Sequence, residues 1–205
     1  MATEFWRILR RSLGAWKRQI LLQRPCGLRR LGKRSVVKWP RKLVGRESIQ
    51  IGDGAYILSN SLILAVSRYA GKRHHPSIRI GNGVYIGRHV YLTAMKEISI
   101  GDSCVLSEHV YITDLSHGFD PTRGPIMSQD IESKGPVQIG ANCFLGYRTA
   151  VMPGVTLGDW CIVGANSVVT QSFPAYSMIA GAPAQLIKIY SRELGKWVPP
   201  DKMEQ

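Results

Sequence analysis

Three side chains that can take up or release a proton lie close together in the stretch ITDLSHGFDP (residues 112–121): Asp114, His117 and Asp120. Histidine is a natural general base, because its imidazole is about half neutral near pH 6.5. A carboxylate three residues away on either side can orient the imidazole or bind a hydroxyl group. The spacing does not choose between the two aspartates. The stretch therefore makes His117 a candidate base for proton transfer, and the alternative is a loop histidine that caps a turn.

On both sides of this stretch the chain repeats every six residues. Glycine often follows the recurring aliphatic residue, and a small or β-branched residue such as Cys143, Thr149 or Cys161 comes four positions after it. A helix of about 3.6 residues per turn would scatter these positions, so a short strand and a tight turn fit better, with glycine at positive φ in the turn. The recurring aliphatic residues are Ile51, Ile57, Ile80, Ile86, Leu92, Ile100, Leu106, Ile112, Ile139, Leu145, Val151, Leu157, Val163 and Val169.

If three such units close one triangular coil, residues eighteen apart stack in a column. Cys143 and Cys161 have this spacing, as do Ile139 and Leu157. Neighbouring coils then pair as parallel strands about 4.8 Å apart, and the aliphatic side chains fill the prism. The alternative, an ordinary β-sandwich, would bring a strand about every 8–12 residues with alternating polarity. The period of six predicts an all-β solenoid.

Two segments leave this repeat. Residues 113–136 contain His117, and "AVSRYAGKRHHPS", between Ile63 and Ile78, contains His74 and His75. Loops that interrupt a solenoid often line its binding face. For the second segment two interpretations stay open: it shapes an acceptor site, or it is a solvated loop.

The charge of the chain is unevenly distributed. The net charge is +13, but residues 1–46 hold fourteen Lys and Arg against Glu4 alone, and residues 47–205 hold thirteen of each sign. A neutral main domain offers no continuous basic face, which argues against nucleic acid. The four cysteines form no C-x-x-C pair, so neither a disulfide framework nor a zinc ribbon is indicated, and a reducing compartment fits.

The N-terminal segment is basic and amphipathic. Residues 3–22 place Phe5, Leu9, Leu13, Trp16 and Ile20 on one helical face, with arginines and lysines mostly elsewhere. Three interpretations stay open: a helix at a membrane surface, a helix packed on the protein, or a cationic arm for an acidic glycan. No run of eighteen apolar residues predicts a membrane span, and the arginines break up any signal peptide. We expect a cytoplasmic protein, with the arm able to reach the inner face of the membrane.

The repeat, followed by "SVVTQSFPAYSMIAGAPAQLIK", resembles the hexapeptide-repeat acyltransferases, whose fold is a left-handed parallel β-helix. The loop "YITDLSHGFDPTRGPIMSQDIESKGPVQIG" looks like the sugar O-acetyltransferase branch, which includes maltose and galactoside acetyltransferases. The resemblance covers residues 47–190. It divides the chain into a basic arm (1–46), the repeat domain (47–190, with the excursion 113–136) and a tail (191–205).

The resemblance implies a set of site residues. His117 is the general base, with Asp114, Asp120, His89 and Phe144 as candidates to orient it or to bind the acceptor. Relatives often carry Trp at the position of Phe144 and a basic residue at that of Gln185. They also often carry Lys at the position of Gln171, so this chain lacks the side chain for one phosphate contact. No metal site is expected, because Thr122 stands where the γ-class carbonic anhydrases of this fold have a histidine. Coenzyme A would contact Tyr147, Ala165, Thr170 and Lys188, in a groove between adjacent subunits of a homotrimer.

The function that the resemblance implies is transfer of acetyl from acetyl-CoA to a saccharide hydroxyl, with a bacterial exopolysaccharide, capsule or lipopolysaccharide sugar as acceptor. The first alternative is N-acetylation of an amino sugar, or acetylation of another small acceptor. The second is a non-catalytic β-helix that serves as a scaffold.

Overall fold

The structure, a computed structural model, describes residues 27–202. The amphipathic helix expected over residues 3–22 lies outside the described residues. Among residues 27–202 no helix is long and apolar enough to cross a membrane.

Three parallel sheets form the faces of a triangular prism, and each turn of the chain adds one strand to every face. Face A contains β1 (Arg30–Leu31), β4 (Ile49–Ile51), β9 (Ser77–Ile80), β12 (Glu97–Ile100), β17 (Val137–Ile139) and β20 (Thr156–Leu157). Face B contains β2 (Val36–Val37), β5 (Tyr56–Ile57), β10 (Tyr85–Ile86), β13 (Val105–Leu106), β18 (Phe144–Leu145), β21 (Ile162–Val163) and β23 (Ser177–Gly181). Face C contains β3 (Lys42–Val44), β6 (Leu62–Ala65), β11 (Tyr91–Ala94), β14 (Tyr111–Thr113), β19 (Ala150–Val151) and β22 (Val168–Val169).

The eighteen-residue register predicted from the sequence is confirmed in the C-terminal coils. Ile139 pairs with Leu157, and Phe144 pairs with Ile162. The recurring aliphatic side chains are buried inside the prism, as are the small residues four positions after them, Cys143, Thr149 and Cys161. Each thiol of this inner column reaches the next coil, as when Cys104 donates to the carbonyl of Gly140 and Cys143 to that of Gly158.

The glycines of the repeat have a different role from the one expected. Positive φ in the turns falls mostly on other residues, such as Asn60, His109 and Asn166. A Cβ atom on Gly146 would lie 2.7 Å from the backbone nitrogen of Ala165 in the next coil. Glycine is needed there because adjacent coils approach too closely for a side chain, not because the backbone is left-handed.

The solenoid begins earlier than the sequence suggested. Strands β1, β2 and β3 pair with β4, β5 and β6 and form a first coil, so the basic arm assigned to residues 1–46 overlaps the prism. At the other end β24 (Ala184–Ser191) and β25 (Lys196–Val198) continue face B as antiparallel strands, so the tail assigned to residues 191–205 contains a strand. Three short 3-10 helices complete the described chain: η1 (Arg46–Ser48), η2 (Ile126–Ser128) and η3 (Pro200–Lys202).

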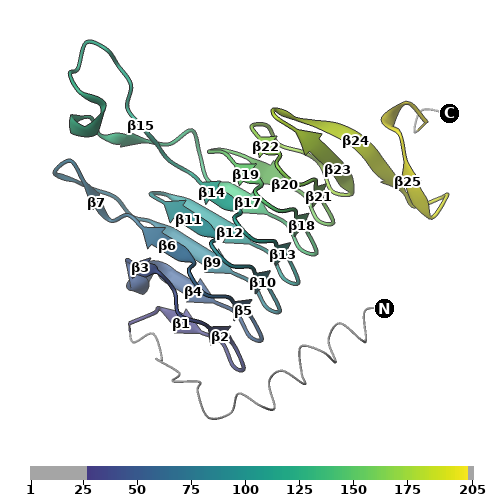
Figure 1. Cartoon of the computed structure of the whole chain (residues 1–205), viewed down its shortest axis with the longest axis horizontal. Coiled ribbons are helices and arrows are strands. Elements are labelled where there is room, and N and C mark those ends of the chain that lie inside the picture. Colours follow the sequence, from purple (N-terminus) through teal and green to yellow (C-terminus); the bar gives the residue numbers. More distant parts are fainter. Residues whose placement is uncertain (1–26, 203–205) are drawn as a thin grey trace.

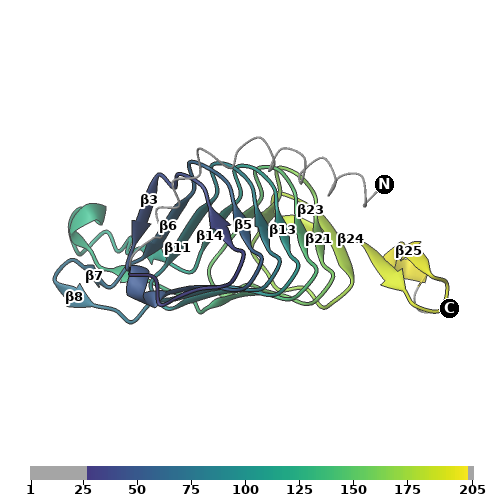
Figure 2. The ribbon, with the colours of Figure 1, turned by 90° about the horizontal axis from the view of Figure 1, so that it is seen from below.

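Both excursions leave the prism at the edge where face C turns to face A, here named the CA edge. The first is a hairpin of β7 (Arg68–Tyr69) and β8 (Lys72–Arg73), and the second contains β15 (Ser116–His117) and β16 (Ile131–Glu132). They project from the same side of the molecule (Figures 1 and 2). The edge between faces B and C, here named the BC edge, has only short turns.

Candidate functional site

His117 lies outside the prism on a short antiparallel ribbon. It is the last residue of β15 and pairs with Ile131 of β16, whose side chain is buried. The next residue, Gly118, continues the ribbon with a hydrogen bond from its N–H to the carbonyl of Asp130. The imidazole is half-buried, so the ribbon fixes its backbone while leaving part of the ring open to a substrate.

The other excursion supplies the contact to this imidazole. The hydroxyl of Tyr69 lies 3.2 Å from Nδ1 of His117, and the two rings meet edge to face with centroids 5.5 Å apart. This partner could not be predicted from spacing, because neither excursion follows the repeat that sets the register elsewhere. Gly71 is a sequence signal for a hairpin turn, and in the structure both Ala70 and Gly71 have positive φ at that turn.

Asp130 makes a second connection between the excursions. Its carboxylate lies 3.1 Å from Nζ of Lys72 and 3.5 Å from Nε2 of His74. His74 therefore belongs to the folded contact between the two excursions and not to a loose loop. With Tyr69 and His117, these contacts hold the hairpin and the ribbon against each other.

Asp114 has a different role from the one expected. Its side chain is fully buried, and its carboxylate accepts the backbone N–H groups of Met95, Lys96 and Glu97 at 2.6 to 2.8 Å. Burial raises the pKa of this carboxyl, and the three N–H donors oppose that rise. Asp114 thus fixes the CA edge of the preceding coil, and its burial keeps it from a solvent-borne acceptor.

Asp120 also does not serve His117 in this structure. Its carboxylate accepts the backbone N–H and the hydroxyl of Thr122 and pairs with Arg123. The hydrogen bonds from Thr122 lower the pKa of Asp120. The backbone of the same turn is held by Gln129, whose amide bonds both the N–H and the carbonyl of Asp120. Neither aspartate hydrogen-bonds to His117 in this structure, so the expectation that one of them orients the imidazole is corrected, and the group beside Nδ1 is the hydroxyl of Tyr69. The expectation that Asp120 binds the acceptor stays a prediction.

Two of the predicted residues, His89 and Tyr147, lie on the BC edge, with His109 between them. The rings of His89 and His109 stack with centroids 4.8 Å apart, and Tyr147 meets His109 edge to face at 5.4 Å. Phe144 lies nearby on face B and is 44% exposed. Stacking follows from the repeat, because turn residues of successive coils occupy equivalent positions. The edge therefore presents a ladder of aromatic rings to solvent.

The positions suggested for coenzyme A are divided between edges of the prism. Ala165 follows Tyr147 on the BC edge, one coil further on, and Asn166 donates its N–H to the carbonyl of Tyr147. The N–H of Ala165 itself has no hydrogen-bond partner within residues 27–202. Thr170 directly follows β22 of face C, and Lys188 lies exposed on β24. Within one chain the structure does not bring Tyr147 and Ala165 to the edge that carries His117.

No cluster of three or more His, Cys, Asp or Glu side chains with the arrangement of a metal site occurs among the described residues. The chemistry available at the CA edge is that of an imidazole with one ring nitrogen held by a phenol. Its other nitrogen, Nε2, has no hydrogen bond to any residue from 27 to 202.

Comparison with known sequences finds similarity to proteins named as acetyltransferases. A model of the hexapeptide repeat of succinyl-transferase matches residues 136–171. Over 126 residues the chain is 34% identical to WbbJ of Escherichia coli K12, which is named for O-acetyl transfer in lipopolysaccharide biosynthesis. This match covers 58% of the present chain and 64% of WbbJ. Over 117 residues it is 35% identical to Rv3034c of Mycobacterium tuberculosis H37Rv, which is named as an acetyltransferase. This second match covers 57% of the present chain and 39% of Rv3034c. The match thus spans less than two thirds of the length of either relative.

Comparison with solved structures shows the fold. AntD, an N-acyltransferase from Bacillus cereus crystallised with dTDP and 3-hydroxybutyryl-CoA, superposes with a TM-score of 0.68 at 18% identity over 83% of this chain and 88% of AntD. A maltose O-acetyltransferase from Clostridium difficile 630 gives a TM-score of 0.56 at 21% identity over 92% of this chain and 86% of that chain. The resemblance to hexapeptide-repeat acyltransferases is confirmed, and the prism is a left-handed parallel β-helix.

Proposed function

We propose that the protein transfers an acetyl group from acetyl-CoA to a hydroxyl group of a saccharide. The observation that carries the proposal is the position of His117, half-buried on a rigid ribbon with Nδ1 facing the hydroxyl of Tyr69 and Nε2 without a protein partner in the described chain. A base held in this way can receive the proton of an attacking hydroxyl.

The reaction needs one proton transfer in each direction. When Nδ1 of His117 carries its proton and donates it to the oxygen of Tyr69, Nε2 keeps a free electron pair. Nε2 then takes the proton of the acceptor hydroxyl while the oxygen attacks the thioester carbonyl. Collapse of the tetrahedral intermediate forms the ester, breaks the C–S bond and returns the proton to the coenzyme A thiolate. Direct attack requires no covalent enzyme intermediate.

The presence of a base favours a hydroxyl over an amine as the nucleophile. A hydroxyl must lose its proton as it attacks, whereas a neutral amine attacks with its own electron pair and loses the proton afterwards. The name of WbbJ also points to O-acetyl transfer, while AntD is an N-acyltransferase of the same fold. N-acetylation of an amino sugar is therefore the second candidate.

The donor site is proposed to lie between subunits of a homotrimer. Tyr147 and Ala165 lie on the BC edge and His117 on the CA edge, so one chain alone does not assemble both sets of residues. A neighbouring copy that sets its BC edge against this CA edge would complete the site. The free N–H of Ala165 can bind a pantetheine carbonyl, and exposed Lys188 can pair with a coenzyme phosphate.

The proposed acceptor is a sugar of a bacterial exopolysaccharide, capsule or lipopolysaccharide. The support is the name of WbbJ, together with the aromatic ladder of His89, His109 and Tyr147 and the exposed ring of Phe144, since aromatic faces suit sugar rings. The basic N-terminal arm would bring the enzyme to a lipid-linked acceptor at the inner face of the membrane.

Substitution of His117 tests the proposal. Release of coenzyme A thiol, followed against a panel of neutral sugars, amino sugars and polysaccharides, should fall about 100-fold or more in His117→Ala. The unfolding midpoint of the variant should match that of the wild type, because the ring is half-exposed. Near-normal transfer by His117→Ala, or failure to bind acetyl-CoA in calorimetry, would refute the function, and the second failure would favour a scaffold.

A further inference from the structure

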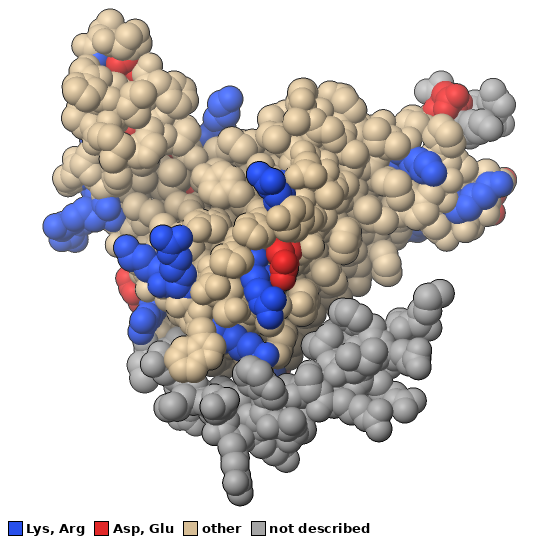
Figure 3. Space-filling view, viewed as in Figure 1, with Lys and Arg blue, Asp and Glu red and all other residues tan. Residues whose placement is uncertain are grey.

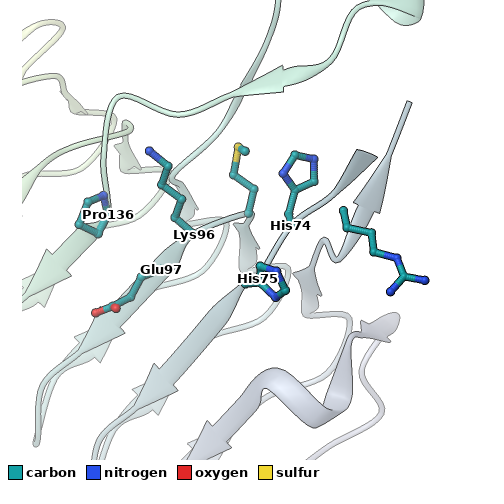
Figure 4. A pocket seen from close by; sticks show the side chains of 7 residues that line it. His74, His75, Lys96, Glu97 and Pro136 are labelled. Atoms are coloured by element: carbon teal, nitrogen blue, oxygen red, sulfur yellow. The ribbon is translucent and has the colours of Figure 1, made fainter. Parts of the chain in front are cut away.

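A pocket of about 460 Å³ opens on the CA edge between the two excursions. Its walls come from three places: the end of the β7–β8 hairpin (Arg73, His74 and His75), the short turn that Asp114 holds (Met95, Lys96 and Glu97), and Pro136 at the end of the second excursion. In Figure 4 the side chains of His74 and Lys96 point to the same side, whereas Glu97 points away from them. The pocket is thus built from three parts of the chain that are fixed to one another.

The charges around the pocket do not cancel. Glu97 is engaged by Arg79, Asp130 by Lys72, and the carboxylate of Asp114 by three backbone N–H groups. Arg73 and Lys96 are both exposed, and within residues 27–202 neither has a carboxylate at ion-pairing distance. The side of the molecule that carries β7 also shows basic side chains with few acidic ones among them (Figure 3).

His74 adds a ring nitrogen that contacts the carboxylate of Asp130 without a hydrogen bond to it. Nε2 of this imidazole is buried, and in the described part of the chain it makes no hydrogen bond, since Asp130 lies at 3.5 Å. A buried polar atom without a hydrogen bond is costly, so a ligand that supplies one is favoured. With Arg73 and Lys96, His74 forms a set of nitrogen atoms suited to oxygen ligands of negative charge.

We propose that this pocket binds an acidic group of the acceptor saccharide, a carboxylate or a phosphate. The inference rests on the proposed function, because one hairpin serves both places. Tyr69 contacts His117. On the opposite strand of the same hairpin, Arg73 is the cross-strand neighbour of Arg68, the residue before Tyr69. A saccharide whose hydroxyl reaches His117 therefore extends past Arg73, and an acidic group on it enters the pocket.

The test measures binding apart from turnover. Met95 lines the pocket, so its ε-methyl group, labelled with carbon-13, reports occupancy by NMR. The probes are methyl glucoside, methyl glucuronide and glucose 6-phosphate, which share a ring and differ in charge. We expect the Met95 resonance to shift with both acidic probes at concentrations at which the neutral glucoside leaves it unchanged. The tighter of the two acidic probes identifies the carboxylate or the phosphate as the preferred group.

The hairpin supplies its own control. Arg68→Gln and Arg73→Gln remove the same charge from cross-strand neighbours, but only Arg73 lines the pocket. We expect Arg73→Gln and Lys96→Gln each to weaken binding of the acidic probes roughly fivefold, and Arg68→Gln to leave it unchanged. The proposal is overturned if the neutral glucoside binds equally well, if no probe shifts Met95, or if Arg68→Gln weakens binding as much as Arg73→Gln. Thiol release with neutral acceptors tests the enzyme separately, so active protein with an indifferent pocket would reject only the acid site.

Discussion

The hydroxyl of Tyr69 lies 3.2 Å from Nδ1 of His117, although 48 residues separate them in the chain. One belongs to the β7–β8 hairpin and the other to the β15–β16 ribbon, and the two meet only because both excursions leave the prism at the same edge. The contact gives each ring nitrogen of His117 a distinct environment. We therefore expect Tyr69 to position the proposed base.

Replacing Tyr69 by Phe should lower kcat while leaving the KM for acetyl-CoA unchanged. The ring and its packing remain, but the oxygen that selects the proton position on Nδ1 is lost. We expect kcat to fall about tenfold, less than for loss of the imidazole itself. Steady-state kinetics across a pH series, with the unfolding midpoint as a check on folding, measures the effect. A variant that lost stability but kept its kcat would assign Tyr69 a purely structural role.

Replacing Asp114 by Asn should destabilise the protein. The carboxylate accepts three backbone N–H groups, two of them through one oxygen, and an amide would present its own N–H₂ to part of this set. Leaving buried donors unsatisfied costs about 2 kcal/mol. Urea unfolding of the variant measures the loss. A variant as stable as the wild type would mean that the turn at residues 95–97 does not depend on this carboxylate.

The contribution of Asp114 to stability should also depend on pH. Burial raises its pKa above the ordinary value of 3.8, so between that value and the raised pKa the folded protein holds more protons than the unfolded chain. Its contribution to the free energy of unfolding is therefore greatest below this window and falls as pH rises through it. The Asp114→Asn variant does not titrate at this position, so the stability advantage of the wild type should shrink with rising pH. The opposite slope would show that the three N–H donors outweigh burial.

The three thiols inside the prism should resist modification in the native state. Cys104, Cys143 and Cys161 are buried and donate to carbonyl groups of the next coil. Hydrogen bonding with Cys104 and then Cys161, together with burial, raises the pKa of Cys143, and the same contacts lower the pKa of its two neighbours. In a Cys26→Ser background, a disulfide reagent should label none of them until denaturant is added. Fast native labelling of any one would show that the coils open.

The sequence predicts the regular part of the protein well and the site only in part. A period of six forces Ile139 over Leu157, because every coil repeats the same strand and turn, and this pairing is confirmed. The same regularity stacks His89 on His109, because the two residues occupy equivalent turn positions in successive coils. Where the period stops, nothing in the sequence specifies which residues of one excursion contact which residues of the other. The contact between Tyr69 and His117 therefore could not be read from spacing.

Asp114 shows how local spacing misleads. Asp114 is only three residues from His117 in the sequence, which suggests that the two side chains are close. In the structure Asp114 directly follows β14, and its side chain is buried at the CA edge before the second excursion begins. His117 lies on the ribbon beyond that point. The glycines mislead in a similar way. Gly146 is required because the backbone of the next coil lies too close for a side chain, and not because of the local turn.

The strand register survives both excursions without a change. Tyr56 pairs with Tyr85 across 29 residues and Val105 with Phe144 across 39, on the same face where Phe144 pairs with Ile162 across 18. The prism therefore places no constraint on how long the inserted segments are. The hairpin and the ribbon at the CA edge can therefore differ in length without shifting the strands, while Tyr69 with His117 and Lys72 with Asp130 join the two excursions to each other. On this scaffold the proposed base and the proposed acid pocket can change with the excursions while the repeat keeps its register.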